Sequence, residues 1–352
     1  MTGTEDLISA LRERIAAAHD RGTPLAIRGG GTKAFLGHRV EGAFLDVSAL
    51  TGIVDYQPGE LVITARAGTR LAELETVLAE HNQMLPFEPP HFGADATLGG
   101  TIAAGLSGPR RPWAGAARDL VLGTRVINGR GELLHFGGDV MKNVAGYDVS
   151  RLMAGAHGTL GVLISVSLKV LPRPAAEITV VQQLDATAAI RRMNELAAKP
   201  WPLSGAYWEA GALYLRLSGA ERAVDAACDA IGGEADDDPE RWTRIRELQT
   251  PLTADTDRLW RLSVPPAAPL ADLPGQWALD WGGAQRWLVT DADANDIRTA
   301  AERAGGHATL FRGDGDARFH PLPEAMLELH RRVRKSMDPA GILNPGRLYA
   351  EL

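Results

Sequence analysis

The chain has 352 residues, 45% of them hydrophobic and 23% charged, which is typical of a soluble globular protein of one large domain or two. Its formal net charge of −7 disfavours a nucleic-acid-binding surface. No apolar run approaches the roughly 18 residues of a membrane-spanning helix, and the acidic N-terminal segment lacks the apolar core of a signal peptide. The single cysteine, Cys228, excludes an internal disulfide and cannot build a metal or iron–sulfur site alone. We therefore expect a cytoplasmic protein, with Cys228 as a small apolar residue on a helix.

The first half of the chain is rich in glycine and predicts short strands between a few helices. It opens with an amphipathic helix whose Leu7, Ile8, Leu11 and Ile15 share one face. Thr69 is a plausible N-cap for a second helix over 70–81. Asn128-Gly129 predicts a hairpin turn between two strands. Further strands are predicted at 24–29, 42–48, 60–68 and 159–172, and a short helix at 148–155.

A proline-containing stretch at 172–177 predicts a boundary, because the pattern changes after it. Strands and surface helices then alternate, as in an α+β lobe with antiparallel strands. The strands are predicted at 178–184, 213–219 and 284–290, and the helices at 186–198, 219–231 and 291–304. The same lobe contains a proline-rich loop at 263–276. A last amphipathic helix begins near 323 and leads into an irregular tail.

The loop "RGGGTK" at 28–33 follows a short strand, and consecutive glycines let backbone N–H groups converge on an anion. It matches the dinucleotide pattern G-x-G-x-x-A, with Asp46 near the place of a ribose-binding acid. However, glycines interrupt the segment where that fold needs a full helix. The order Thr32-Lys33 does not fit a P-loop. The pyrophosphate loop of another flavin fold and a bare glycine turn both remain open.

Two further glycine clusters follow, at 89–111 and 142–164. In the first, Gly99-Gly100 before "TIAAG" predicts a short helix whose free N–H groups suit an anion. In the second, glycines surround a turn into a long strand. Three such clusters on one small domain indicate that several backbone segments approach one large, flat, phosphorylated ligand.

The order of "RGGGTK", "ATLGGTIAAGLSG", "GYDVSRLMAGAHGTLGV" and "MDPAGILNPGR" resembles the FAD-binding fold of the vanillyl-alcohol-oxidase type, also called PCMH-type. Within that superfamily, "LPFEPPHFG" and "LWRLSVPP" resemble the FAD-binding E-type subunits of bacterial glycolate oxidase (glycolate dehydrogenase) complexes. The resemblance implies an α+β chain: a PCMH-type FAD-binding domain over 1–175, a smaller α+β cap lobe on the substrate side with an antiparallel sheet over 176–322, and a C-terminal segment, 323–352, that returns to the FAD domain.

The same resemblance implies the residues that contact the cofactor. The loop would hold the FAD pyrophosphate by backbone N–H groups, with two basic residues adding charge, and the tail would return towards the isoalloxazine. For each glycine, a role in its own turn alone remains the alternative. The implied FAD-binding residues are Arg28, Gly29, Gly30, Gly31, Thr32, Lys33, Pro90, Thr97, Gly99, Gly100, Ala103, Gly105, Ser107, Gly158, Gly161, Val162 and Asn344.

Two departures from the family pattern carry information. Relatives with covalently bound flavin have a histidine where this chain has Thr32, so we expect the FAD to be non-covalent. Metal-dependent relatives carry a "HxGDGNxH"-like stretch, whereas this chain has "FRGDGDARFH" at 311–320, with Arg312 in place of the first histidine. One histidine cannot complete a metal site, so we predict none, and Asp314, Asp316 and Arg318 are interpreted as a polar turn. His157 is interpreted as a solvated loop residue.

The catalytic residues are not assigned by the sequence. A 2-hydroxy acid needs a cation for its carboxylate, and Arg110, Arg111, Arg261 and Arg312 are candidates, although each also suits a structural role.

The resemblance implies a glycolate oxidase complex that converts glycolate to glyoxylate, with D-lactate as a further candidate substrate. It implies a second flavin subunit of the metal-dependent type and an iron–sulfur subunit, with any association at the inner membrane made through these partners. The chain would relay electrons or support the assembly. A self-sufficient FAD-dependent 2-hydroxy-acid dehydrogenase and a flavin-free structural subunit are the alternatives.

Overall fold

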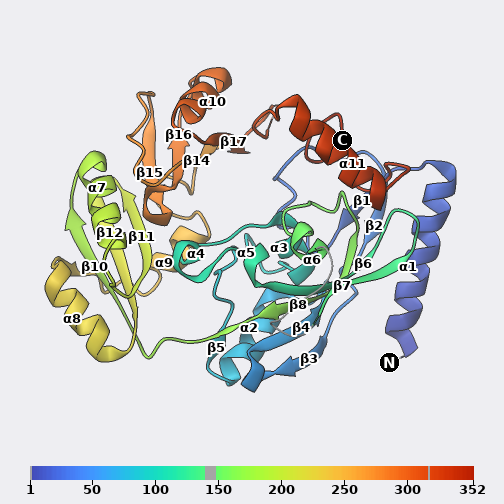
Figure 1. The fold of residues 1–352 in the computed structure, drawn as a ribbon, viewed down its shortest axis with the longest axis horizontal. Coiled ribbons are helices and arrows are strands. Elements are labelled where there is room, and N and C mark those ends of the chain that lie inside the picture. The colour runs from blue at the N-terminus through green and yellow to red at the C-terminus, as the bar shows by residue number, and fades with distance from the viewer. Residues whose placement is uncertain (1, 139–147, 316–317) are drawn as a thin grey trace. The chain divides into compact units, whose positions relative to one another are not determined.

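The computed structural model describes residues 2–138, 148–315 and 318–352 (Figure 1). Asp316 and residues 142–147 of the third glycine cluster therefore lie outside the described residues. The chain forms two compact units. The first unit contains residues 1–106, 116–172 and 321–352, and the second contains 107–115 and 173–320. The chain passes from the first unit to the second at Pro172, and the segment 107–115 groups with the second unit rather than with its sequence neighbours.

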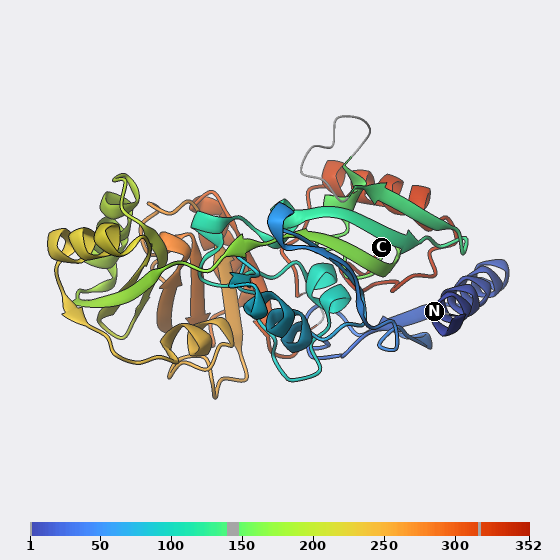
Figure 2. The same cartoon turned by 90° about the horizontal axis from the view of Figure 1, so that it is seen from below.

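The first unit is built on a five-stranded antiparallel sheet with the strand order β3-β4-β8-β6-β7, which Figure 2 shows from below. Strand β8 is buried over almost its whole length because it lies at the centre of the sheet. The five strands are β3 (Ile53–Gln57), β4 (Val62–Arg66), β6 (Val121–Ile127), β7 (Leu133–Gly137) and β8 (Val162–Lys169).

Short helices cover this sheet and complete one hydrophobic core. The apolar face of α2, with Leu71, Leu74 and Leu78, is fully buried against it. The helices of the unit, apart from the first and the last, are α2 (Leu71–Glu80), α3 (Leu98–Ala104), α5 (Ala117–Leu120) and α6 (Val149–Leu152). A small antiparallel pair, β5 (Gln83–Met84) with β9 (Leu171–Pro172), lies beside them.

A second core of the first unit joins the start of the chain to its tail. Helix α1 (Thr2–Arg21) buries Ile8, Leu11 and Ile15 against the parallel pair β1 (Leu25–Arg28) and β2 (Ala43–Asp46). Leu343 also belongs to this core and forms an isolated parallel bridge with Leu25. The tail follows α11 (Glu324–Met337), so segments far apart in the sequence complete one unit.

The second unit contains an eight-stranded sheet with the order β13-β10-β12-β11-β15-β16-β14-β17. Only two residue pairs join β11 to β15, so the sheet consists of two halves. Helices α7 and α8 pack on the first half and α10 on the second. The elements are α4 (Arg111–Ala114), β10 (Ala176–Gln183), α7 (Ala186–Ala197), β11 (Leu203–Glu209), β12 (Ala212–Gly219), α8 (Glu221–Ile231), β13 (Glu234–Ala235), α9 (Arg241–Arg246), β14 (Leu259–Ser263), β15 (Gln276–Asp280), β16 (Gln285–Val289), α10 (Ala294–Arg303) and β17 (His307–Arg312).

Seven strands were not predicted from the sequence: β3, β5, β11, β13, β14, β15 and β17. The prediction that Thr69 caps the second helix is wrong, because Arg70 occupies the N-cap position. The Thr69 hydroxyl instead accepts a hydrogen bond from the Gly52 N–H at 3.0 Å. Asn128 does end the first strand of a hairpin, but the turn runs to Glu132, whose N–H donates to the Asn128 side chain. Cys228 lies on α8 and is partly exposed.

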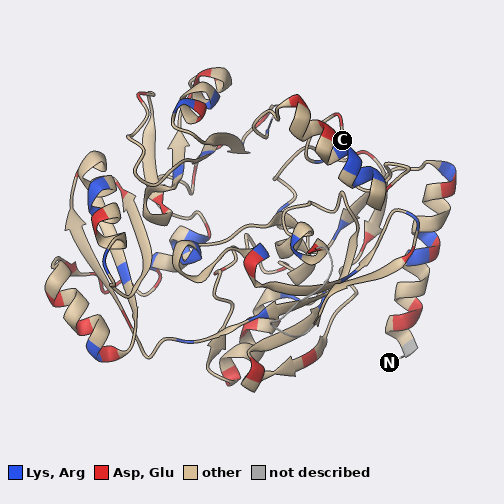
Figure 3. Cartoon of the chain, viewed as in Figure 1, with Lys and Arg blue, Asp and Glu red and all other residues tan. Residues whose placement is uncertain are grey.

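Figure 3 shows both signs of charge interspersed along the surface helices, for example on α8 and α10. Among the described residues, no helix combines the length and apolar character that crossing a membrane requires.

Candidate functional site

The loop Arg28–Lys33 presents a row of unused hydrogen-bond donors. Strand β1 ends at Arg28, and its pairing with β2 closes with a bond from the Val47 N–H to the Arg28 carbonyl, 3.0 Å long. The N–H groups of the next four residues, Gly29 to Thr32, have no acceptor in the part of the chain that the structure describes. These residues are partly exposed rather than buried, so an anion can reach them. Backbone N–H groups in such a row are suited to phosphate oxygens.

The loop is held in place by the segment 93–97. A Cβ atom on Gly30 would overlap the carbonyl oxygen of Asp95, so only glycine fits there. Gly29 lies close to Thr97, since a Cβ on it would approach the Thr97 Oγ1 to 2.7 Å. The structure therefore places the first and second glycine clusters in direct contact, and this contact requires two of the predicted glycines for packing.

The two basic residues of the loop differ in their surroundings. Lys33 is only 9% exposed, and its Nζ donates to the His91 carbonyl at 3.1 Å and lies 5.9 Å from the centre of the Phe92 ring. Arg28 is exposed and lies over the ring of Phe44 at 5.8 Å. Lys33 thus contributes a fixed positive charge, while Arg28 remains available to a ligand.

A residue of the tail that was not assigned from the sequence stabilises this loop. Arg347 donates from Nη1 to the His38 carbonyl at 2.7 Å and from Nη2 to the Ala34 carbonyl at 3.1 Å. The position of Arg347 in the motif "LNPGR" could have indicated a role for it at the site. The motif does not show which carbonyl groups the guanidinium contacts. Arg347 fixes the turn directly after the glycine loop.

The helix predicted at Gly99 and Gly100 is present as α3, but the prediction that its first N–H groups are free is wrong. The Leu98 N–H donates to the Thr69 carbonyl at 2.8 Å, and that of Gly99 to the Ala67 carbonyl at 2.7 Å. The Gly100 N–H donates to the Thr97 hydroxyl, which caps α3. The helix start is therefore already satisfied by the protein, and Gly99 serves the packing of α3 on the end of β4. A ligand contact from this segment must come from side chains or from atoms further along the helix.

The third cluster is connected to the tail through Asn344. This residue is 6% exposed and has a positive φ of 41°. Its Oδ1 accepts from the Ile27 N–H at 2.8 Å, and its Nδ2 donates to the His157 carbonyl at 2.7 Å. A Cβ on Gly158 would come within 2.7 Å of the same Nδ2. Asn344 therefore joins β1, which delivers the glycine loop, to the turn of the third cluster.

The remaining predicted residues lie in several different surroundings. The Ala103 carbonyl accepts from the His157 N–H at 2.9 Å, and Gly105 ends α3 with a φ of 65°. Pro90 and Gly161 are buried, and the Val162 side chain is 1% exposed in the core with α1. Ser107 belongs to the second unit. Val162 consequently has no side-chain surface to offer a ligand.

The four arginines considered for a carboxylate all lie in the second unit. Arg110 donates from Nη2 to the Glu177 carboxylate at 2.6 Å, and Arg312 donates from Nη1 to the Thr253 carbonyl at 2.7 Å. Arg111 lies over the Trp281 ring at 4.3 Å. Arg261 lies over Phe311 at 5.6 Å, and its pKa is lowered to about 10 by burial and by the nearby charge of Arg111. Arg110 and Arg312 are therefore structural, and Arg261 remains as a candidate.

No group of three or more histidine, cysteine, aspartate or glutamate side chains suited to a metal ion occurs among residues 2–138, 148–315 and 318–352. Within the "FRGDGDARFH" stretch, the Arg318 carbonyl accepts from the Leu310 N–H, and His320 pairs with Glu302 at 3.1 Å. These contacts are local to the second unit. The described part of this stretch is therefore a turn whose contacts are made to β17 and α10.

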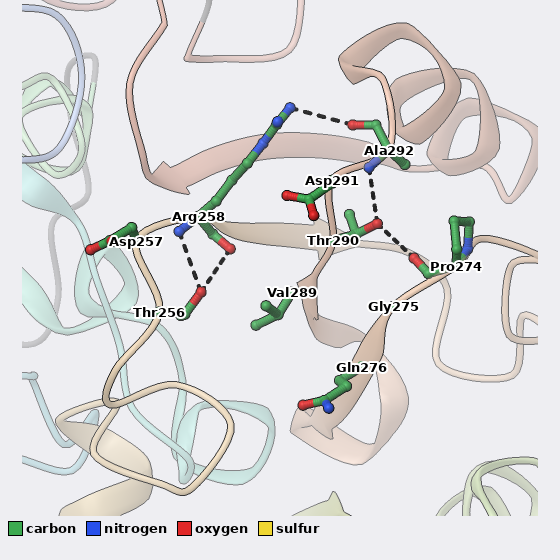
Figure 4. Close-up of a pocket in the computed structure, with 10 residues that line it drawn as sticks. All are labelled: Thr256, Asp257, Arg258, Pro274, Gly275, Gln276, Val289, Thr290, Asp291 and Ala292. Carbon is green, nitrogen blue, oxygen red and sulfur yellow. Dashed lines mark hydrogen bonds between the residues drawn. The ribbon is translucent and has the colours of Figure 1, made fainter.

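A pocket of about 770 Å³ lies at one end of the second half-sheet, between β14, β15 and β16 (Figure 4). Arg258 extends across it and donates to the Ala292 carbonyl at 3.3 Å. The Thr290 hydroxyl donates to the Pro274 carbonyl at 2.6 Å. None of the predicted flavin residues lines this pocket. The Arg258 and Thr290 side chains form hydrogen bonds between the loops that surround it.

The residues of the first unit fit a dinucleotide cofactor with a pyrophosphate. In the part of the chain that the structure describes, the N–H groups of Gly29 to Thr32 have no acceptor, and Lys33 and Arg28 add positive charge beside them. The second glycine cluster packs against this loop, and the third is connected through Asn344 to the strand before it. Together with the five-stranded antiparallel sheet, this arrangement defines an FAD-binding domain of the PCMH-type class.

The comparisons with known proteins agree with this class. Residues 6–137 match the family described as "FAD binding domain". The chain is 49% identical over 347 residues to the glycolate oxidase subunit GlcE of Escherichia coli (strain K12), and the match covers 99% of both chains. The chain belongs to this family of FAD-dependent oxidoreductase subunits, and its cofactor is FAD.

More distant relatives share the domain. The D-lactate dehydrogenase of Archaeoglobus fulgidus is 26% identical, over 95% of this chain and 88% of that protein. The glycolate oxidase subunit GlcD of Bacillus subtilis is 30% identical over 171 residues, which is 47% of this chain and 36% of that protein. Among solved structures, an alkyldihydroxyacetonephosphate synthase matches with a TM-score of 0.66 and 14% identity, over 95% of this chain and 74% of that one. This last similarity shows a common fold.

Proposed function

We propose that this chain is the FAD-binding subunit of a complex that oxidises glycolate to glyoxylate, with D-lactate as a second substrate. The observation that carries the proposal is the row of N–H groups from Gly29 to Thr32, for which the described residues offer no acceptor, in a chain 49% identical to a glycolate oxidase subunit. The row gives this chain a cofactor site of its own, which a purely structural subunit would not need.

In this proposal, different residues of the first unit have different roles in binding the cofactor. The N–H groups of Gly29–Thr32 bind the pyrophosphate, and Arg28 and Lys33 offset its charge. Asn344 and Arg347 act as positioning residues, since they fix the strand before the loop and the turn after it. When bound, FAD would supply redox chemistry, taking up electrons and passing them on, and the residues named here would hold it. The flavin is held non-covalently, because Thr32 offers a hydroxyl where a tethering relative has an imidazole.

The chain relays electrons or supports the assembly, and a partner flavin subunit of the metal-dependent type carries the oxidation of the substrate. Two observations support this division. Arg312 replaces the first histidine of the metal-binding pattern, and its guanidinium is committed to the Thr253 carbonyl. An iron–sulfur subunit completes the electron path in this proposal, and contact with a membrane is made through the partners.

A visible spectrum of the purified chain tests this function. We expect flavin absorbance with the FAD intact, no anaerobic bleaching by glycolate when the chain is alone, and bleaching after the partner subunits are added. A colourless protein after incubation with excess FAD would contradict the cofactor site. Bleaching by glycolate without partners would contradict the relay role and would support the alternative below.

The alternative is a self-sufficient 2-hydroxy-acid dehydrogenase, and Arg261 is the specific observation in its favour. Its guanidinium has no acidic partner among the described residues and is available for a substrate carboxylate. The two proposals give opposite results in the bleaching experiment without partners. They agree on the cofactor and on the class of substrate.

A further inference from the structure

One face of the second half-sheet carries polar and aromatic residues instead of an apolar core. The opposite face, with Trp260, Leu262 and Leu288, packs against α10. Neighbouring residues on a strand point to opposite faces, so Arg261 and Ser263 of β14 lie on the other side. Arg261 is in register with Trp287 of β16 and with Thr309 of β17, and Ser263 with His307. These five residues form the polar face of the second half-sheet.

Arg261 is unusual on this face because nothing neutralises it. It makes no side-chain hydrogen bond and no ion pair in the portion of the chain that the structure describes. Other arginines of the unit that are withdrawn from solvent have partners: Arg110 pairs with Glu177 at 2.6 Å, and Arg241 with Asp236 at 2.8 Å. Arg286, the most buried of them, donates to the Gly283 and Pro269 carbonyls. Exposed arginines need no partner because water hydrates them, whereas Arg261 is partly buried and has no hydrogen-bond or acidic partner among the described residues, so its guanidinium is available to a ligand.

A second cation, Arg111, lies near Arg261. The repulsion between the two positive charges disfavours the charged form of Arg261. Its guanidinium stacks on the Trp281 ring at 4.3 Å, which holds it in one orientation. Trp281 in turn donates from Nε1 to the Gly108 carbonyl at 3.0 Å. The pKa of Arg261 is lowered to about 10 by burial and by Arg111, so the guanidinium is still charged at neutral pH. A poorly hydrated cation beside a like charge destabilises the fold unless an anion binds there.

We propose that Arg261, with Arg111 beside it, forms a binding site in the second unit for the carboxylate of a small 2-hydroxy or 2-oxo acid. That choice of acid rests on the proposed function, whereas the preference for a carboxylate rests on the two cations. A guanidinium binds a carboxylate with two parallel hydrogen bonds. The hydroxyl groups of Ser263 and Thr309 lie on the same face and suit the oxygen at the second carbon of such an acid.

The aromatic neighbours limit the size of the ligand. Trp287 and Phe311 contact each other edge to face, with ring centroids 5.0 Å apart, and Phe311 also lies against Arg261. These rings form an apolar wall next to the charge. A short acid fits such a site better than one with a second charge at its far end, because the second charge would lose water against the wall.

The test compares thermal unfolding of the FAD-loaded chain with glycolate and with glycolamide, its neutral analogue, at constant ionic strength. A ligand that binds only the folded state raises the unfolding temperature. We expect glycolate to raise it and glycolamide not to do so. In Arg261→Met we expect a higher unfolding temperature without ligand, because an unpaired charge is removed, and no glycolate shift. Arg303→Met, at an exposed position on α10, is the matched control and should keep the full shift.

Arg261→Lys keeps the charge but not the paired hydrogen bonds, so its affinity for glycolate should fall roughly tenfold. A glycolate shift in Arg261→Met equal to that of the unchanged chain would overturn the proposed site. An equal shift with acetate would overturn the 2-hydroxy-acid preference. Flavin absorbance, recorded on the same samples, reports on the proposed function separately, since Arg261 lies outside the unit that holds FAD.

Discussion

Arg347 and His38 are joined by a reciprocal pair of hydrogen bonds. The Arg347 guanidinium donates to the His38 carbonyl at 2.7 Å, and the His38 N–H donates to the Arg347 carbonyl at 3.0 Å. These residues are 309 positions apart in the sequence. The pair fixes the turn after the glycine loop, so the orientation of the phosphate-binding N–H groups depends on the tail.

The first prediction concerns this pair. Arg347→Met removes charge-assisted hydrogen bonds to the His38 and Ala34 carbonyls, and we expect the unfolding free energy to fall by about 2–3 kcal/mol. The dissociation constant of FAD should rise roughly tenfold, because the loop loses its support. Equilibrium dialysis of the apoprotein with FAD measures the second effect. Arg332→Met, on an exposed part of α11, should change neither quantity. Unchanged FAD affinity in Arg347→Met would show that the loop is rigid without the tail.

The second prediction concerns Gly30. A methyl group at this position overlaps the Asp95 carbonyl, so Gly30→Ala must displace the loop or the segment 93–97. We expect the purified variant to contain little flavin, by the ratio of visible to ultraviolet absorbance, and to unfold at a lower temperature. Gly59→Ala is the control, since no atom lies within 4 Å of a Cβ placed there. Full flavin content in Gly30→Ala would exclude this loop as the pyrophosphate site.

The third prediction concerns the attachment of the flavin. Thr32 carries no imidazole, and its hydroxyl lies 3.4 Å from the Lys33 Nζ. Precipitation with acid should therefore release all the yellow colour into the supernatant, and the pellet should show no flavin fluorescence. Fluorescence that stays with the unfolded chain would mean that another residue forms a covalent bond. Thr32→Val should retain FAD, since the proposed contact is made by the backbone N–H.

The fourth prediction concerns Asn344. Asn344→Ala removes the hydrogen bonds that Asn344 makes to the Ile27 N–H and the His157 carbonyl, at a cost of about 1–3 kcal/mol for a buried polar group that loses its partner. We expect a lower midpoint in urea and weaker FAD binding. Asn295→Ala, on exposed α10, should leave both unchanged. A decrease in stability without any change in FAD affinity would restrict Asn344 to a structural role.

The fifth prediction concerns pH. Burial, followed by the charges of Arg261 and His320, lowers the pKa of His307 below its usual value. The unfolded chain then binds a proton more readily than the folded one, so stability is highest above pH 6.5 and falls as the pH drops through and below that value. His307→Gln should flatten this part of the stability curve, as measured by urea unfolding at a series of pH values. An unaltered curve would assign the acid sensitivity to other groups.

The sequence predicted FAD correctly because three glycine clusters on one domain indicate a single large phosphorylated ligand, whereas each cluster alone is also consistent with a simple turn. The order of "RGGGTK", "ATLGGTIAAGLSG" and "AGAHGTLGV" is a long pattern, and the comparisons confirm the cofactor and the family. The helices α7, α8 and α10 were also predicted to within a few residues, since their apolar faces repeat regularly. Strands such as β11 were missed because they are buried on both sides and show no alternation of polar residues.

The errors at the site have a different origin. Whether an N–H group is free depends on contacts between segments that are distant in the sequence. Gly99 looks like a phosphate contact by its neighbours along the chain, but the Ala67 carbonyl accepts its N–H. Arg110 and Arg261 are equally plausible in the sequence, and only the structure shows that Glu177 neutralises one of them. Patterns of residue types predict the cofactor, whereas the use of each donor follows from tertiary packing.

The contact between the tail and the glycine loop also sets an order of events during synthesis. The residues of the loop leave the ribosome long before Asn344 and Arg347, which are separated from their partners Ile27 and His38 by 317 and 309 positions. At about 5–20 residues per second, the interval is on the order of 15 to 60 s. During that time the second unit can fold, while the nascent cofactor site lacks two of its supports. Stable capture of FAD is therefore expected late, after the tail has left the ribosome, and the half-formed site must stay soluble until then.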